Sequence, residues 1–114
     1  MTAMLISPSS ASPWRIEIAR FNDWLTSRWP DLRSEPHRMD QRAHVWAWPD
    51  FHEVWVPGER DCAWIDAGAE RTSAVAVWLA STTTEPLILC DEGYSLVIPL
   101  EVATEASVAA SLAG

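Results

Sequence analysis

The chain has 114 residues, a formal net charge of −8 and 48% hydrophobic residues, which fits one folded domain and excludes an intrinsically disordered chain. The acidic balance excludes nucleic acid and an anionic membrane as expected partners, because binding to phosphates requires clustered cations. The acidity is uneven, since residues 1–42 carry a net charge of +1 and residues 43–114 carry −9.

Residues 1–13 contain two Ser-Pro steps, which interrupt regular structure, and we predict a flexible N-terminal tail there and a single domain over 14–114. No basic segment precedes the short apolar stretch at residues 3–6, and no apolar run is long enough to span a bilayer. We therefore expect a cytoplasmic protein.

A helix is predicted from Pro13 to Trp29, because apolar residues recur at spacings of three and four. Ser12 is a suitable N-cap, Pro13 suits the first turn, and Pro30 ends the helix. The polar segment 31–41 is predicted to be a loop.

Three strands are predicted next, over residues 43–48, 52–56 and 61–65, and the short turns between them favour an antiparallel meander. The pattern then predicts a helix over 68–80 with Asp66 as a cap. Two further strands follow, joined by a turn at Asp91-Glu92-Gly93, and a terminal helix capped by Thr104. The ranges of these last elements are 87–90, 94–100 and 105–112.

The predicted order is α-β-β-β-α-β-β-α, which indicates an α+β domain with an antiparallel five-stranded sheet packed with helices. This order of elements, in a chain of this length and acidity, resembles the small dimeric chaperones of bacterial type III secretion. It is also similar to several compact toxin-immunity proteins and inhibitors encoded by phages. The resemblance covers nearly the whole chain as element order, and it implies a role in binding another protein.

Residues capable of catalysis or metal binding form no recognisable motif. His37, His44 and His52 fall close together, but neither a zinc-site spacing nor HExxH is present. Cys62 and Cys90 lie in apolar, strand-like runs, as buried thiols do. We predict no cofactor and no metal, and we keep a small enzyme using His44, His52 or Cys62 as a third hypothesis.

Four tryptophans on the predicted meander, Trp46, Trp48, Trp55 and Trp64, are the most informative residues. They form the core if the helices pack on the aromatic face, and an exposed patch if the helices pack on the other face. Tryptophans exposed beside charged residues are typical of protein interfaces.

The first hypothesis is an immunity or inhibitor protein that neutralises a basic partner enzyme, such as a toxin or a nuclease, by direct occlusion. The second is a secretion-type chaperone that binds a client protein as a homodimer. The partner-binding residues predicted under the first hypothesis lie on the meander and the two hairpin turns: Trp46, Trp48, Trp55, Glu53, Glu59, Asp61, Asp91 and Glu92.

Overall fold

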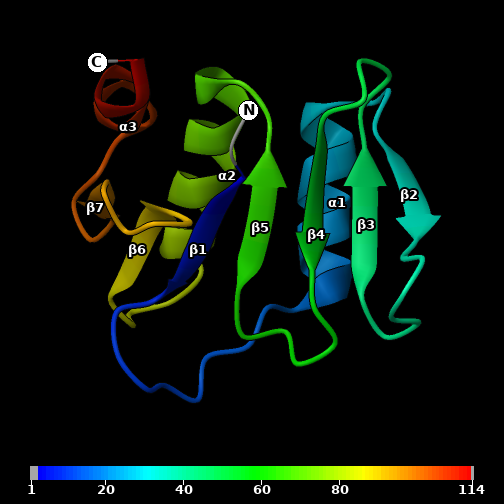
Figure 1. Cartoon of the computed structure of the whole chain (residues 1–114), viewed down its shortest axis with the longest axis horizontal. Helices are drawn as coiled ribbons and strands as arrows, with labels where there is room; N and C mark the ends of the chain where they lie inside the picture. The colour runs from blue at the N-terminus through cyan, green and yellow to red at the C-terminus, as the bar shows by residue number, and fades with distance from the viewer. Residues whose placement is uncertain (1–2, 114) are drawn as a thin grey trace.

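One antiparallel sheet of seven strands forms the framework of the computed structural model, which describes residues 3–113 (Figure 1). The strands lie in the order β2-β3-β4-β5-β1-β6-β7. They are β1 (Met4–Pro8), β2 (Arg33–Pro36), β3 (His44–Ala47), β4 (Glu53–Val56), β5 (Ala63–Asp66), β6 (Leu87–Asp91) and β7 (Val97–Pro99). The helices are α1 (Ile18–Arg28), α2 (Ala69–Ser81) and α3 (Glu105–Ala113).

The predicted α+β class is confirmed, but the predicted number of five strands is wrong. The first additional strand, β1, lies within the predicted flexible tail and is hydrogen-bonded to β5 on one side and β6 on the other. Both partners come much later in the chain, so nothing in the local pattern around Met4–Pro8 reveals the pairing. With β1 and β2 included, the order of elements along the chain is β-α-β-β-β-β-α-β-β-α.

The second additional strand, β2, lies within the predicted loop and pairs with β3 at the edge of the sheet. All four of its residues are exposed, and its sequence, Arg-Ser-Glu-Pro, has no apolar alternation. Backbone pairing with β3 holds this segment extended, and that interaction leaves no trace in side-chain hydrophobicity.

The predicted first helix begins five residues too early. Residues 13–17 are not helical, and α1 starts at Ile18 with Glu17 as its N-cap residue. The backbone N–H of Ile16 donates instead to the carbonyl of Arg60, at 2.8 Å. This contact with the turn between β4 and β5, together with burial of Trp14 and Ile16, outweighs the local helix signal. The predicted second helix matches α2 to within one residue, although Gly68 and not Asp66 is its N-cap residue.

Helices α1 and α2 cover one face of the sheet, which they lie behind in Figure 1, and α3 packs beside α2. Strand residues that point toward α1 and α2 alternate with residues that point away. Trp46, Val54 and Ile65 are cross-strand neighbours on the covered face and belong to the main hydrophobic cluster. Within residues 3–113, none of the helices is both long and apolar enough to cross a membrane.

Candidate functional site

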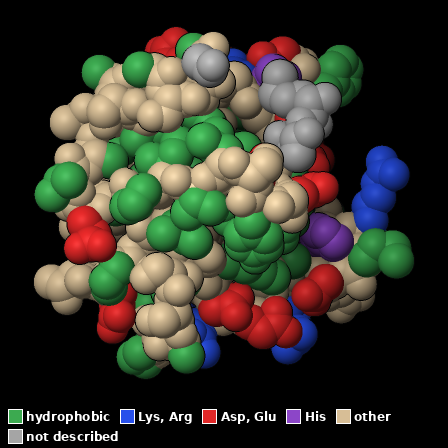
Figure 2. Space-filling model, turned by 60° about the vertical axis from the view of Figure 1, so that its left-hand side comes forward, with side chains coloured by type: hydrophobic (Ala, Val, Ile, Leu, Met, Phe, Trp, Pro, Cys, Tyr) green, Lys and Arg blue, Asp and Glu red, His purple; other side chains and the backbone are tan. Residues whose placement is uncertain are grey.

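The face of the sheet opposite α1 and α2 carries a continuous cross-strand row of apolar side chains. This open-face row takes one residue from each of six neighbouring strands: Val45, Trp55, Trp64, Leu5, Cys90 and Val97. None of the six belongs to the main hydrophobic cluster. Val45 and Cys90 are buried, so the accessible part of the row consists of Leu5, Trp55, Trp64 and Val97. Figure 2 views the molecule obliquely and shows hydrophobic side chains gathered in its middle with Asp and Glu side chains along the lower border.

Trp55 and Trp64 form the centre of the open-face row. They are direct cross-strand partners on β4 and β5, and their rings are stacked, with centroids 6.0 Å apart and an interplanar angle of 11°. Both side chains are partly exposed. A stacked pair of this kind stabilises a sheet by about 0.5–1.5 kcal/mol beyond its buried area. It also presents a large rigid aromatic surface, the kind of surface that dominates many protein interfaces.

Two carboxylates border this stack, and each is two residues from the tryptophan on its own strand. Glu53 on β4 is the cross-strand partner of Asp66 on β5, so two like charges face each other on adjacent strands. No arginine or histidine within residues 3–113 forms an ion pair with either. One oxygen of Asp66, Oδ1, is buried without a hydrogen-bond partner. Opposed like charges destabilise a sheet, so nothing in the described chain explains this pair as a stabilising feature.

The predicted partner-binding residues Trp46 and Trp48 lie in the core, with exposed fractions of 1% and 2%. The ring of Trp46 packs edge-on against Phe21 at 5.2 Å, and its Nε1 donates to Asn22 Oδ1 at 2.9 Å. For these two tryptophans, the structure shows the core alternative. Trp55 and Glu53, by contrast, lie together on the open face.

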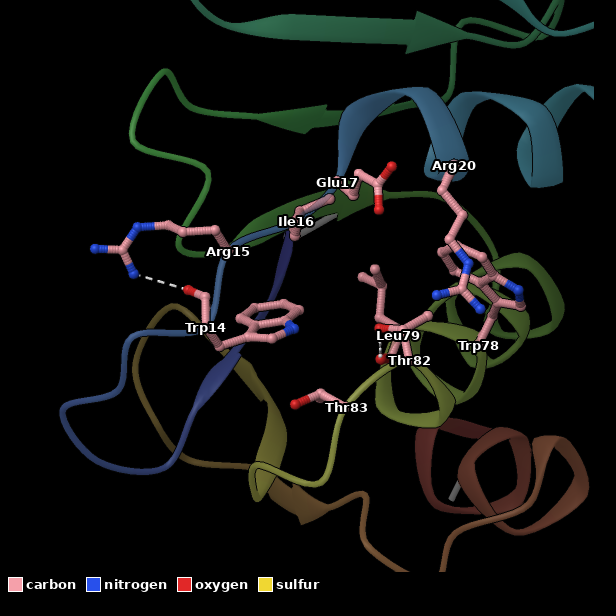
Figure 3. Close-up of a pocket in the computed structure, with 9 residues that line it drawn as sticks. All are labelled: Trp14, Arg15, Ile16, Glu17, Arg20, Trp78, Leu79, Thr82 and Thr83. Carbon is pink, nitrogen blue, oxygen red and sulfur yellow. Dashed lines mark hydrogen bonds between the residues drawn. The ribbon is translucent and has the colours of Figure 1, made fainter.

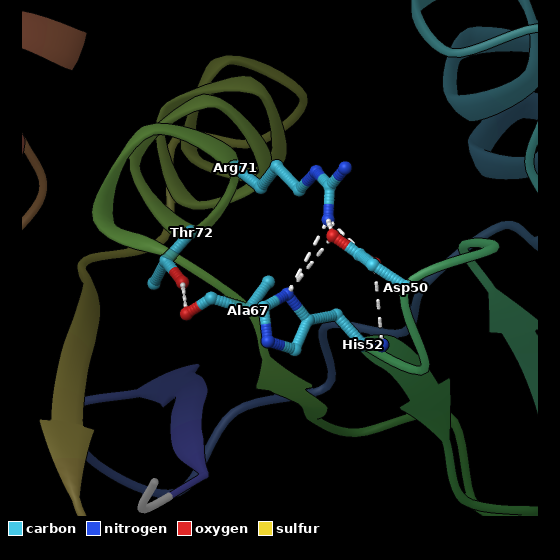
Figure 4. Close-up of polar contacts among 5 residues, drawn as sticks. All are labelled: Asp50, His52, Ala67, Arg71 and Thr72. Carbon is cyan, nitrogen blue, oxygen red and sulfur yellow. Dashed lines mark hydrogen bonds and ion pairs between the residues drawn. The ribbon is translucent and has the colours of Figure 1, made fainter.

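Asp50, His52 and Arg71 form a polar cluster (Figure 4), and Arg71 of this cluster contacts Trp48. The guanidinium of Arg71 lies over the Trp48 ring at 4.6 Å and donates to Asp50 Oδ2 at 2.9 Å. The side chain of His52 points toward the same guanidinium. Partial desolvation alone would raise the pKa of Asp50, but hydrogen bonds from Arg71 and the His52 backbone outweigh it and lower that pKa.

The predicted contact residues Glu59 and Asp61 lie in the exposed turn between β4 and β5. Arg42 pairs with Glu59 at 3.4 Å. Asp61 forms no ion pair with any residue in the described part of the chain. Burial raises the pKa of the neighbouring Cys62 thiol to about 12, and the charges of Asp61 and Glu59 add to the effect. A thiol with this pKa is almost entirely protonated at neutral pH, and the thiolate is the nucleophilic form.

The predicted contact residues Asp91 and Glu92 lie at the turn between β6 and β7. Strand β1 separates β6 from β5 and β4 in the sheet, so this turn is not next to the strands that carry Trp55 and Trp64. The carboxylate of Asp91 accepts hydrogen bonds from the Ser95 hydroxyl and from the backbone N–H groups of Ser95, at 2.8 Å, and Leu96, at 3.3 Å. The Ser95 hydroxyl contributes most to lowering the pKa of Asp91. Asp91 therefore organises its turn. Asp91 is partly buried, whereas Glu92 is exposed.

The three histidines do not converge. His37 accepts backbone hydrogen bonds through Nδ1 in its own loop, His44 stacks on Trp46, and His52 belongs to the Asp50 cluster. Within residues 3–113, no group of three His, Cys, Asp or Glu side chains is arranged to hold a metal ion.

A small hollow lies between the segment before α1 and the end of α2 (Figure 3). Arg15 turns away from it and donates to the Trp14 carbonyl at 2.7 Å, while Arg20 lies over the Trp78 ring at 5.8 Å. Glu17 and the C-terminal end of α2 also border it. Because helix C-termini carry partial negative charge, this arrangement does not favour an anionic ligand.

Sequence reasoning placed Trp64 on the meander but did not include it, Asp66 or Leu5 among the contact residues. The missed signal was an acid and a tryptophan spaced two residues apart on both strands: Glu53 and Trp55 on β4, and Trp64 and Asp66 on β5. In an antiparallel pair this spacing places the two tryptophans opposite each other and the two acids opposite each other. Leu5 was missed because its strand was not predicted.

Comparisons of this chain with protein-family models, with curated proteins and with solved structures found no match.

Proposed function

We propose that this chain is a small acidic protein-binding protein that neutralises a basic partner enzyme by direct occlusion, and that it docks through the open face of its sheet. The observation that carries the proposal is the Trp55–Trp64 stack, which lies outside the main hydrophobic cluster on a face without a helix. An apolar row that crosses six strands suits a protein partner, and a hollow lined by Val45, Glu53 and Trp55 lies on the same face.

Charge supports a basic partner. The chain carries a net charge of −8, and Glu53 and Asp66 border the aromatic stack without an ion-pair partner in the described chain. Complementary charge chiefly speeds association, whereas buried aromatic contacts slow dissociation. Self-association through the same face, as a homodimeric chaperone requires, would bring two sets of carboxylates together.

An enzymatic role receives less support from the residues available. The sequence-based candidates were His44, His52 and Cys62. The two histidines are engaged with Trp46 and with the Asp50 cluster, and the Cys62 thiol has a pKa of about 12.

The test is to isolate the partner from the native host with tagged chain, purify it, and measure affinity by calorimetry for the wild type and for Trp64→Ala. We expect the substitution to weaken binding by more than ~2 kcal/mol, about thirtyfold, because central aromatic residues dominate interfaces. The matched control is Val102→Ala, which truncates an exposed apolar side chain in the turn before α3. Equal affinity of wild type and Trp64→Ala for the purified partner would refute docking through this face.

A further inference from the structure

Twice among residues 3–113, an arginine lies over a tryptophan ring and also pairs with a carboxylate. Arg71 lies over Trp48 at 4.6 Å and pairs with Asp50 at 2.9 Å. Arg28 lies over Trp29 at 5.3 Å and pairs with Glu105 at 3.0 Å. In each case the guanidinium lies over the indole while an N–H group reaches a carboxylate oxygen, a combination that suits arginine better than lysine.

The open face presents the same components without the arginine. Trp55 and Trp64 supply the stacked indoles, and Glu53 and Asp66 supply two carboxylates that face each other across adjacent strands. No arginine of residues 3–113 lies over either of these rings or pairs with either carboxylate.

We propose that the partner protein supplies this arginine, which lies across the Trp55–Trp64 stack and places its guanidinium at the Glu53–Asp66 pair. The inference rests on the proposed function and specifies the central contact of the same face. Each carboxylate is two residues from its tryptophan, about 7 Å along the strand, a distance that an extended arginine side chain spans. The guanidinium has five N–H donors on two edges, so one group can serve both carboxylates.

The charge at this site selects a basic occupant over a second copy of the chain. A second copy would bring another Glu53–Asp66 pair to the same place, and like charges brought together at an interface oppose association. Two cations of the chain lie near this face. Arg33, on the edge strand β2, is in the same cross-strand row as Glu53, but Ala47 lies between them. Arg38 borders the same hollow as Trp55 and Glu53, but it forms no ion pair with Glu53. A basic partner contact therefore relieves the repulsion between the two carboxylates, which a second acidic copy would increase.

The experiment uses the full chain and a capped tripeptide, acetyl-Gly-Arg-Gly-amide, followed through the indole N–H signals of Trp55 and Trp64 by NMR. Trp55→Phe and Trp64→Phe assign the two signals. We expect the arginine peptide to shift both signals saturably, at millimolar concentrations. The matched lysine peptide should bind at least about threefold more weakly because it cannot stack or bridge as arginine does. The citrulline peptide, which is nearly isosteric but uncharged, should produce no saturable shift.

Glu53→Gln should weaken binding of the arginine peptide by about threefold or more, the upper range for an exposed ion pair. The matched control is Glu101→Gln, which removes the same charge from an exposed turn between β7 and α3 and should leave the affinity unchanged. Equal binding of the citrulline peptide, or wild-type affinity in Glu53→Gln, would overturn the inference. A homodimer that dissociates on Trp64→Ala in sedimentation would also overturn it.

The two proposals fail separately. If affinity for the purified partner depends on Trp64 but the arginine peptide does not bind, the face is the docking surface and the arginine contact is refuted. If the peptide binds as expected but the partner is insensitive to Trp64→Ala, the arginine site is real and occlusion through this face is refuted.

Discussion

The two faces of the sheet use the same residue type in opposite ways. On the covered face, Trp46 is 1% exposed, packs edge-on against Phe21 and has its indole N–H satisfied by Asn22. On the open face, Trp55 and Trp64 stack on each other and remain partly exposed beside an unneutralised pair of carboxylates. The period of two along a strand separates the tryptophans that hold the fold from those available to a partner.

The largest expected effect separates the two classes of tryptophan by stability. Trp46→Ala should lower the free energy of unfolding by about 3–5 kcal/mol, because it removes a core side chain and leaves a cavity. Trp64→Ala should cost about 1–2 kcal/mol, since it loses the stacking and only part of a buried area. Urea denaturation followed by circular dichroism measures both, and equal costs would contradict the division between the faces.

Neighbouring residues on β1 repeat the comparison within one strand. Ile6 is fully buried on the covered face, whereas Leu5 lies in the open-face row. Ile6→Ala should cost about 2–5 kcal/mol, and Leu5→Ala less than about 1.5 kcal/mol, because its side chain already contacts water. The two variants serve as controls for each other, since they share a strand and a pairing register. A Leu5→Ala cost as large as that of Ile6→Ala would mean that something covers the open face, and sedimentation would then detect self-association.

The carboxylates on the two sides of the sheet differ in their ion pairing: Asp50 has an arginine partner, whereas Glu53 and Asp66 form no ion pair within residues 3–113. Asp50 is paired with Arg71, and its pKa in the folded state is lowered. Its contribution to stability is therefore present above the unfolded pKa of about 3.9. This contribution is lost as the pH falls through the folded pKa. Asp50→Asn should therefore lower the melting temperature at pH 7. The difference between the wild-type and variant melting temperatures should shrink as the pH falls below about 4 and through the folded pKa of Asp50. Added salt should also narrow the difference at pH 7. A difference that persisted at acid pH would show that the effect is not electrostatic.

Much of the fold could be predicted from the sequence because it is encoded locally. The meander followed from alternation and turn residues, and α2 from its apolar spacing. β1 and the start of α1 could not be predicted, because pairing with β5 and β6 and the hydrogen bond from Ile16 to Arg60 are long-range contacts.

For the candidate site, the alternation put Glu53 and Trp55 on one face, but it did not reveal which face the helices cover. Both faces of the meander carry tryptophan, so hydrophobicity alone does not distinguish core from surface. That choice is made by α1, whose Phe21 and Asn22 engage Trp46.

The smallest expected effect has the opposite sign to the others and tests the open face most directly. Glu53→Gln should raise the free energy of unfolding by about 0.2–0.5 kcal/mol, because it removes the repulsion between two carboxylates on adjacent strands. Glu35→Gln is the matched control, since Glu35 lies opposite Val45 and has no carboxylate across from it. The gain should shrink in high salt, where the repulsion between the carboxylates is screened. A loss of stability in Glu53→Gln would mean that this carboxylate has a stabilising partner within the chain. A gain in stability combined with weaker binding of the arginine peptide would identify Glu53 as a residue retained for function at a cost in stability.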